Sequence, residues 1–452
     1  MNDSAKRTIE ISSGVPMLPQ WQMSSPVDFT LCEGEHIAII GPNASGKSKL
    51  IDIILGRHPL KEGRIEYSFP SPTRRWVSEN IKYLAFKDCY GGETDQNYYL
   101  QQRWNSWDVE DERILMSSGE LRKHSLSKIL DKDPAVLILD NPYVGLDQSS
   151  REALSEKLQS IKDSGKTSLI LVLSRKGEIP PFITHIVQVK DGTVLPKKTL
   201  QEWREEASEY TNEYSESPLL SKTAPPETSE EIIRLNHVTI RYGQKTILKD
   251  LDWVVHKGER WALTGPNGSG KSTLLGIVCA DNPQSYACDI ALFGRKRGTG
   301  ESIWDIKKHI GYVSPELHRS FKRDITAERI VANGLRDFHG LFTKANEEEL
   351  QIARVCLDKF GIRDLAQRSF LEISSGEQRL VLLARAFVKN PDLLILDEPF
   401  HGLDDENVAL VRGIIDEYCS NPENTLLMVT HYPAELPECI TLCKSLVKSN
   451  KD

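Results

Sequence analysis

The sequence lacks any long run of apolar residues. Its longest unbroken apolar stretches, such as Leu169 to Leu173, are far shorter than the ~20 residues that a membrane-spanning helix needs. The opening residues, MNDSAKRTIE, also lack the apolar segment of a signal peptide. We therefore expect the chain not to cross a bilayer by itself. We expect it to lie in the cytoplasm, either free or peripheral at the cytoplasmic face of the membrane.

The lack of excess basic residues and of paired cysteines disfavours two classes of protein, nucleic-acid-binding proteins and disulfide-rich proteins. The net charge is −8, so the chain has no overall excess of basic residues and nucleic acid is an improbable partner. None of the eight cysteines forms a C-x-x-C pair, which favours free thiols in a reducing compartment over a disulfide framework. The remaining composition, with 39% hydrophobic and 27% charged residues, is that of an ordinary globular protein.

An internal repeat is the main feature that the sequence does contain. GPNASGKS at 41–48 recurs as GPNGSGKS at 265–272, an offset of 224 (265 minus 41). SSGE at 117–120, LILD at 137–140 and GLD at 145–147 recur further along with an offset of 257 (374 minus 117). A constant offset over this span indicates two copies of one fold, with 33 residues fewer (257 minus 224) between the first two motifs of the first copy.

The repeat and a change in composition predict the domain boundaries. Residues 206–230 are rich in Ser, Glu, Thr and Pro and show little periodicity, which is typical of a linker. We therefore expect one domain at 1–205 and a second at 231–452. Apolar strand-like runs alternate with helical stretches in each copy, which favours an α/β fold built on a mainly parallel sheet.

A glycine-rich loop of the form G-x-x-x-x-G-K-[ST] lies between an apolar run and a helical stretch in both copies. Such a loop lets backbone N–H groups surround a phosphate at the N-terminus of a helix. The residues expected to bind nucleotide in this way are Gly41, Pro42, Asn43, Ala44, Ser45, Gly46, Lys47 and Ser48, and Gly265, Pro266, Asn267, Gly268, Ser269, Gly270, Lys271, Ser272 and Thr273. We expect both lysines to reach the β- and γ-phosphates of ATP, and Ser48 and Ser272 to ligate Mg²⁺.

An apolar run that ends in aspartate follows in each copy and predicts a second Mg²⁺ ligand there, Asp140 or Asp397. In the second copy Glu398 comes next and can polarise the attacking water. In the first copy Asn141 stands at that position. Because an amide cannot accept a proton, we expect the first site to bind ATP and to hydrolyse it slowly.

The following apolar run ends at a position that also differs between the copies. The second copy has His431 there, and the first has Ser174, at the same offset of 257 (431 minus 174). A histidine at this position is placed to hydrogen-bond the γ-phosphate. We therefore predict Lys271, Glu398 and His431 as catalytic residues.

The order of these motifs resembles that of ABC-type ATPases, whose signature is usually LSGGQ. Here the signature is MSSGE at 116–120 and ISSGE at 373–377, with serine in place of the first glycine. The resemblance implies two tandem P-loop NTPase domains, each a mainly parallel sheet flanked by helices with a helical subdomain and an antiparallel β part. It also implies head-to-tail pairing, in which each ATP lies between one domain's phosphate loop and the other domain's signature. Pairing within one chain and exchange of halves in a homodimer both fit.

This resemblance implies two unlike ATP sites. The competent one combines residues of the second copy with the first signature: Lys271, Ser272, Asp397, Glu398, His431, Ser117, Ser118 and Gly119. The degenerate one combines the first copy with the second signature: Lys47, Ser48, Asp140, Asn141, Ser374, Ser375 and Gly376. Tyr242 matches the aromatic residue that stacks on adenine. Trp21 is its weaker counterpart in the first copy, where packing is an equally good interpretation.

Residues 292–314, LFGRKRGTGESIWDIKKHIGYVS, closely resemble the second half of the tandem ATPases associated with molybdate transport. ABC ATPases usually carry a Gln just after this run, where it senses Mg²⁺ and contacts a permease helix. Here Ser314-Pro315-Glu316 follow, and Ala85-Phe86-Lys87 stand in the first copy. The resemblance therefore implies a separate membrane permease, coupled without this Gln.

We accordingly interpret the chain as a tandem ABC ATPase linked to molybdate uptake, with ATP and Mg²⁺ as cofactors. Two other interpretations stay open. One is an ABC ATPase that acts on ribosomes or nucleic acid, although such proteins usually carry a long charged linker and a catalytic Glu in both copies. The other is a regulatory ATPase that responds to nucleotide or molybdate.

Overall fold

The structure is a computed structural model that divides into two compact units. Unit 1 consists mainly of the residues up to Tyr214, and unit 2 mainly of those from Ser215 onward. The described residues are 6–69, 76–85, 133–144, 146, 148–208, 230–243, 245–315, 317, 324–336, 344–430 and 435–447. The predicted linker, 206–230, lies largely outside them, and α6 (Leu200–Ser208) continues past residue 206.

The described residues of unit 1 form two sheets. An antiparallel sheet has the order β2-β1-β4, and a larger, mainly parallel one has the order β10-β8-β3-β7-β6-β5, with β9 paired to β8. The strands are β1 (Arg7–Pro16), β2 (Val27–Cys32), β3 (Ile37–Ile40), β4 (Leu60–Tyr67), β5 (Ile81–Ala85), β6 (Val136–Asp140), β7 (Ser168–Leu173), β8 (His185–Lys190), β9 (Thr193–Val194) and β10 (Lys198–Thr199).

Unit 2 repeats this plan. Its antiparallel sheet has the order β12-β11-β14-β15, and its parallel sheet has the order β16-β17-β18-β13-β19. The strands are β11 (Glu231–Tyr242), β12 (Lys245–His256), β13 (Arg260–Thr264), β14 (Asp289–Leu292), β15 (Arg295–Lys296), β16 (Ile310–Val313), β17 (Leu393–Asp397), β18 (Thr425–Val429) and β19 (Leu442–Ser445).

The two parallel sheets share one strand order. In unit 1 the order β8-β3-β7-β6-β5 places the strand before the phosphate loop between two others, as β19-β13-β18-β17-β16 does in unit 2. The register agrees as well, because Leu139 is level with Leu171 and Leu396 is level with Met428. The predicted fold class, two tandem α/β P-loop domains with an added antiparallel β part, is confirmed.

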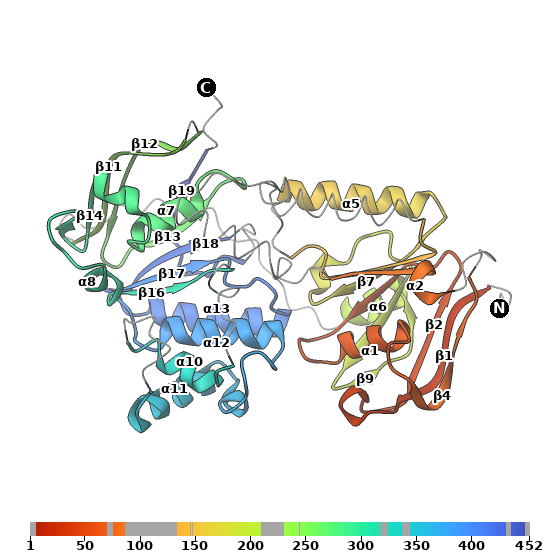
Figure 1. Cartoon of the computed structure of the whole chain (residues 1–452). Helices are drawn as coiled ribbons and strands as arrows, with labels where there is room; N and C mark the ends of the chain where they lie inside the picture. Colours follow the sequence, from red (N-terminus) through yellow and green to blue (C-terminus); the bar gives the residue numbers. More distant parts are fainter. Residues whose placement is uncertain are drawn as a thin grey trace. The chain divides into compact units, whose positions relative to one another are not determined.

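Helices cover the parallel sheets. In Figure 1, α7 lies on one side of the unit 2 sheet and α12 and α13 on the other. The described helices of unit 1 are α1 (Lys47–Ile54), α2 (Val77–Asn80), α5 (Gln148–Asp163), α6, η1 (Pro19–Trp21) and η3 (Lys176–Glu178). Those of unit 2 are α7 (Lys271–Val278), α8 (Ile303–Lys307), α10 (Ala327–Ala332), α11 (Glu347–Lys359), α12 (Ser375–Phe387), α13 (Asp405–Cys419), η4 (Pro283–Ala287) and η5 (Arg363–Leu365).

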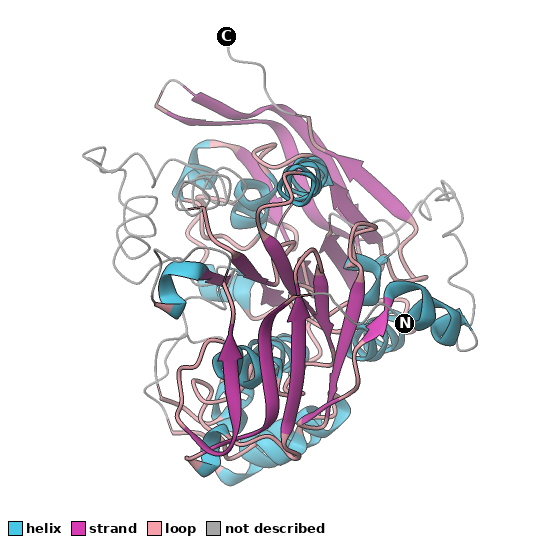
Figure 2. Cartoon of the chain, turned by 90° about the vertical axis from the view of Figure 1, so that its right-hand side faces the viewer, coloured by secondary structure: helices cyan, strands magenta, loops and turns pink. Residues whose placement is uncertain are grey.

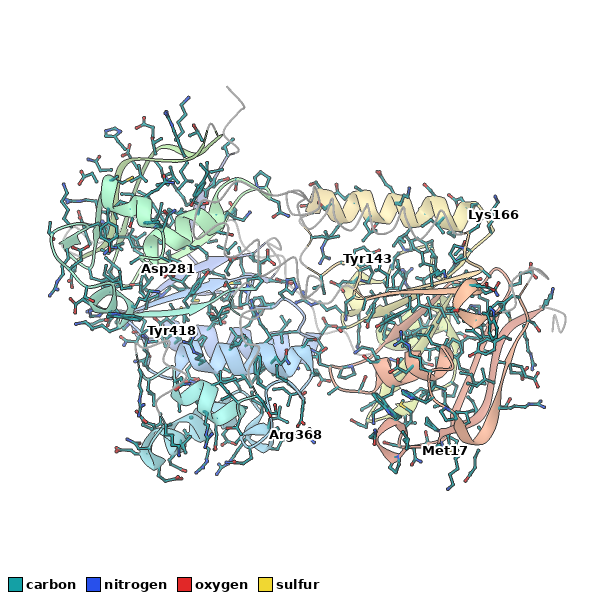
Figure 3. The ribbon with its side chains drawn as sticks, in the orientation of Figure 1. Met17, Tyr143, Lys166, Asp281, Arg368 and Tyr418 are labelled. Carbon is teal, nitrogen blue, oxygen red and sulfur yellow. The ribbon has the colours of Figure 1, made fainter. Side chains whose placement is uncertain are left out.

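Each unit has its own apolar core. Strands β6 and β17 are buried along their whole length, which explains why their sequences are continuous apolar runs and do not alternate. Figure 2 shows the strands as layers flanked by helices. Tyr418, labelled in Figure 3, is buried beside the unit 2 sheet and donates its hydroxyl hydrogen bond to the carbonyls of Pro391 and Thr425.

Within the described residues, no helix is both long and apolar enough to span a bilayer.

Candidate functional site: two phosphate loops and the turns beside them

The phosphate loop of unit 2 connects β13 to α7, and two of its glycines are structurally required. Gly265 and Gly270 have φ angles of 140° and 95°, which side-chain-bearing residues rarely adopt. A Cβ atom on Gly265 would lie 2.5 Å from the carbonyl oxygen of Leu446, and one on Gly270 would lie 2.8 Å from the Leu248 side chain. The loop therefore folds tightly, and the N-terminus of α7 follows it directly.

Lys271 begins α7 and is buried, with an exposed fraction of 8%. Its ammonium donates to the carbonyls of Gly265 and Pro266, at 2.6 and 3.0 Å. The buried hydroxyl of Ser269 has no hydrogen-bond partner among the described residues. A buried cation, an unsatisfied hydroxyl and a helix N-terminus fit the phosphate chain of a nucleotide, because each interacts favourably with anionic oxygens.

The phosphate loop of unit 1 has the same geometry. Lys47 begins α1 and donates to the carbonyls of Gly41 and Pro42, at 2.6 and 2.7 Å. Gly46 has a φ of 105°, and the hydroxyl of Ser45 is again buried without a partner in this part of the chain. Burial lowers the pKa of Lys47 to about 8, against the opposing effect of the nearby Asp140 carboxylate. The first copy therefore has the same arrangement of lysine, buried hydroxyl and helix N-terminus as the second.

The predicted metal ligand Asp397 ends β17, which lies beside β18, which in turn lies beside β13. Because these strands are parallel, the phosphate loop, Asp397 and the residues after β18 emerge at one edge of the sheet. Asp397 itself is buried to an exposed fraction of 7%. Ser272 is exposed beside Lys271 on the first turn of α7. The donor set at this edge, a carboxylate and a hydroxyl, is the oxygen set that Mg²⁺ prefers.

Glu398 follows Asp397 in a tight turn. Its φ is 48°, in the left-handed region that non-glycine residues seldom occupy. Two backbone hydrogen bonds maintain the turn, from the N–H of Glu398 to the carbonyl of Val429 (2.9 Å) and from the N–H of His401 to the carbonyl of Glu398 (3.1 Å). The turn thus fixes the backbone conformation of the predicted base.

Arg379, on α12, holds the same turn from the other side. Its guanidinium donates to the carbonyls of Asp397 at 2.8 Å, Glu398 at 2.5 Å and Pro399 at 3.3 Å. With an exposed fraction of 2%, it is one of the largest fully buried side chains of the described chain. The sequence alone does not single out Arg379, because its role depends on the packing of α12 against the end of β17.

The equivalent turn in unit 1 has the same backbone and different side chains. Asn141 has a φ of 51°, its N–H donates to the carbonyl of Val172 (2.9 Å), and its carbonyl accepts from Val144 (3.3 Å). The Asn141 amide donates to Asp140 at 3.1 Å. The hydroxyl of Ser174 lies 3.3 Å from Oδ1, the side-chain amide oxygen of Asn141. The two residues that replace a base and a histidine thus lie within hydrogen-bond distance of each other.

Tyr83, on β5, adds a contact to this site that the sequence analysis missed. Its hydroxyl donates to the second oxygen of Asp140 at 3.0 Å. Burial, and next the Asp140 charge, raise the pKa of Tyr83, so the phenol stays protonated and remains a donor. Both carboxylate oxygens of Asp140 are therefore hydrogen-bonded to neutral donors. A metal ion at Asp140 would have to displace or share these bonds.

The signature of unit 2 forms the start of α12. Ser374 is its N-cap and makes a capping box with Glu377, in which each side chain bonds the other residue's backbone N–H. The spacing Ser-x-x-Glu is a sequence signal for this motif, which accepts either Glu or Gln at its last position. Ser375 and Gly376 form the first turn of α12, where backbone N–H groups lack intrahelical acceptors and can bind an anion.

The two aromatic candidates lie in different surroundings. Tyr242 ends β11, packs against the unit 2 core, and its hydroxyl accepts a bond from Asn282 at 3.1 Å. Trp21 stacks on His58 with ring centroids 4.4 Å apart and planes inclined by 16°. Since one face of the indole is already occupied, packing accounts for Trp21 without an adenine.

Several predicted residues lie outside the described part of the chain. They are His431, the first signature with Ser117, Ser118 and Gly119, and Glu316 at the position of the missing Gln. Ser314 directly follows β16, is buried, and its hydroxyl accepts a bond from the N–H of Leu317 at 3.1 Å. Ser314 therefore serves the local turn.

The family model described as ABC transporter matches residues 24–144 and 248–401, so it covers both phosphate loops and both of the turns described above. The chain belongs to the ABC transporter ATPase family. This ABC ATPase is 36% identical to the ABC transporter ATP-binding protein ModF of Escherichia coli, with 96% of each chain covered. It is 30% identical to an uncharacterized ABC transporter ATP-binding protein of Schizosaccharomyces pombe, with 92% of each chain covered.

Solved structures support the fold. The ABC ATPase matches a chain in a model of ribosome-bound archaeal Pelota and ABCE1 with a TM-score of 0.61, over 89% of this chain and 71% of that one. The sequence identity of that match is 17%, so the likeness concerns the fold alone.

Proposed function

We propose that the chain hydrolyses ATP at the site of unit 2 and retains ATP with little turnover at the site of unit 1. One observation carries the proposal. The turns after β6 and β17 share a left-handed first residue and the same two backbone bonds, yet that residue is Asn141 in one and Glu398 in the other. The scaffold for a base is therefore present twice, and the base once.

The roles follow from the chemistry of these side chains. Lys271 and the N-terminus of α7 would hold the phosphate chain and stabilise negative charge on the transferred group. Glu398 would accept a proton from the water that attacks the γ-phosphorus, with ADP as the leaving group. Ser272 and Asp397 would hold Mg²⁺, which supplies charge neutralisation when bound. His431, which lies outside the described residues, stays a predicted contact to the γ-phosphate.

Replacing Glu398 with Gln tests the proposal. The amide keeps the size of the side chain and removes the proton acceptor, so phosphate release should fall at least ~100-fold while ATP binding persists. Phosphate release and equilibrium binding of a fluorescent ATP analogue measure the two properties separately. If Glu398→Gln retained near-normal hydrolysis, the base would be assigned wrongly.

We further propose that this ATPase acts in molybdate uptake through a separate permease. Residues 292–314 resemble tandem ATPases associated with molybdate transport, and the relation to ModF extends over 96% of the chain. Cells that lack the chain should accumulate less molybdate, and the wild-type gene should restore uptake where the Glu398→Gln form does not. Unchanged uptake, with ATPase activity stimulated by molybdate in vitro, would favour the regulatory interpretation. Co-sedimentation with ribosomes in ATP would favour the other one.

A further inference from the structure

His401 lies beside Glu398 in unit 2. Its Nδ1 atom is 3.0 Å from Oε2 of Glu398, which is hydrogen-bond distance, and the two residues are three apart on the turn after β17. The His401 side chain has an exposed fraction of 7%, against 22% for Glu398. The histidine is therefore enclosed by the protein, whereas the carboxylate extends toward solvent.

The two copies differ at this position in step with the base. His401 corresponds to Val144 by the offset of 257 (401 minus 144), and Glu398 corresponds to Asn141. Both turns have the same backbone, since Val144 and His401 each donate an N–H to the residue three positions earlier, at 3.3 and 3.1 Å. Valine fits the turn, so the turn does not require histidine for its conformation. The imidazole is present in the copy that has the carboxylate.

We propose that His401 is a positioning residue for Glu398: its Nδ1–H holds one carboxylate oxygen and orients the base toward the attacking water. This inference rests on the proposed function, in which Glu398 is the base. An ionised carboxylate can only accept hydrogen bonds, so the proton between the two groups resides on Nδ1. Hydrogen bonds to charged groups are the stronger ones, so this contact can restrict the rotation of the glutamate.

Orientation matters here because a glutamate has several rotatable bonds. A free glutamate side chain would sample many rotamers, of which few bring an oxygen within ~3 Å of the water. An enclosed imidazole on a turn that Arg379 fixes through three carbonyls provides a rigid anchor. The effect of His401 belongs to the chemical step and leaves ATP binding at Lys271 unaffected, so kcat should change and KM should not.

Two substitutions at one position test the proposal. His401→Val installs the residue of the first copy and removes the donor. His401→Asn shortens the side chain, as His401→Val does, but keeps an N–H near the position of Nδ1. We expect kcat for ATP to fall roughly 10- to 100-fold in His401→Val, with KM within about twofold, and to recover most of its value in His401→Asn. His401→Ala gives a second variant without a donor, and the melting temperature of each form checks folding.

The outcomes separate this inference from the proposed function. Equal kcat values in His401→Val, His401→Ala and wild type would overturn the positioning role, as would equal losses in His401→Val and His401→Asn. Activity in Glu398→Gln would overturn the base itself. In the double variant Glu398→Gln/His401→Val, we expect no further loss beyond Glu398→Gln, because the histidine acts through the glutamate.

Discussion

The turn after β6 and the turn after β17 are one backbone with two sets of side chains. Each begins with a residue in the left-handed region, Asn141 at 51° and Glu398 at 48°. Each is tied to the neighbouring strand by the same N–H···O=C bond of 2.9 Å. Backbone and core packing therefore maintain the fold in both units, whereas the proposed difference in hydrolysis depends on a few side chains at the sheet edge.

The side chains of the two turns also have different hydrogen-bond partners. In unit 1, Asp140 accepts bonds from Asn141 and Tyr83, and Ser174 lies within hydrogen-bond distance of Asn141. In unit 2, Glu398 pairs with His401. Neutral amide, hydroxyl and phenol groups form a network that needs no nucleotide to be stable. A carboxylate held by an imidazole remains able to accept a proton.

The largest difference in ATP turnover should be between variants of the two phosphate-loop lysines. We expect Lys271→Ala to reduce ATP turnover at least ~100-fold, since it removes the cation that stabilises the transferred phosphate beside Glu398. Lys47→Ala should reduce turnover less than about fivefold, because the role proposed for the unit 1 site is to bind nucleotide with little turnover. Phosphate release at saturating ATP measures both.

Each lysine variant serves as the control for the other. Both lysines are buried and bonded to two carbonyls of their own loop, so the structural cost of the two substitutions is matched. Equal losses of turnover would mean that the two sites contribute equally, and the contrast between the units would be lost.

The sequence was sufficient for the parts of the site that are contiguous. The phosphate loops, the apolar strands ending at Asp140 and Asp397, and the exchange of Glu398 for Asn141 are all visible as short motifs with a fixed offset. The parallel sheet was predictable for the same reason, because a continuous apolar run between a turn and a helix is typical of a buried parallel strand.

The side chains that support the site were not predictable in this way. Arg379 reaches the turn after β17 from α12, and Tyr83 reaches Asp140 from a neighbouring strand. Both contacts depend on packing between elements distant in the sequence. His401 is three residues from Glu398, yet its contact requires the left-handed backbone at Glu398, which a propensity argument would not assign to a glutamate. The capping box of Ser374 and Glu377, in contrast, is visible in the sequence as Ser-x-x-Glu before an apolar run.

A moderate loss of thermal stability should appear in mild acid, and it should originate in unit 1. His36, in unit 1, is buried, and burial, with Lys162 as a smaller cause, lowers its pKa. The N–H of Leu169 donates to its Nδ1 at 3.2 Å, so the folded state holds the ring neutral. The equivalent residue of unit 2 is Arg260, at the offset of 224 (260 minus 36), which does not titrate in this range.

The direction follows from proton linkage. A histidine whose folded pKa is lowered binds more protons when unfolded, so its stabilising contribution is complete above pH ~6.5 and is lost as the pH falls below that value. We expect the melting temperature to drop by more between pH 7.5 and 5.5 in the wild type than in His36→Asn, which keeps an acceptor and does not titrate. Parallel losses in both forms would exclude His36 as the cause. In that case His185, whose pKa burial also lowers, would be the next residue to replace.

The smallest effect on turnover should come from Asn141→Ala. The substitution removes a bond of 3.1 Å to Asp140 and an acceptor near Ser174, in a region that water can reach. We expect turnover within about twofold of wild type and a stability loss of about 1–2 kcal/mol, because alanine tolerates the left-handed φ of 51° less well than asparagine and the partly exposed neutral hydrogen bond adds little. Phosphate release and thermal melting measure the two quantities. The result is informative because Glu398→Gln, at the equivalent position, should abolish turnover. A tenfold loss in Asn141→Ala would show that the amide takes part in the reaction cycle, and unit 1 would then be an active partner of unit 2.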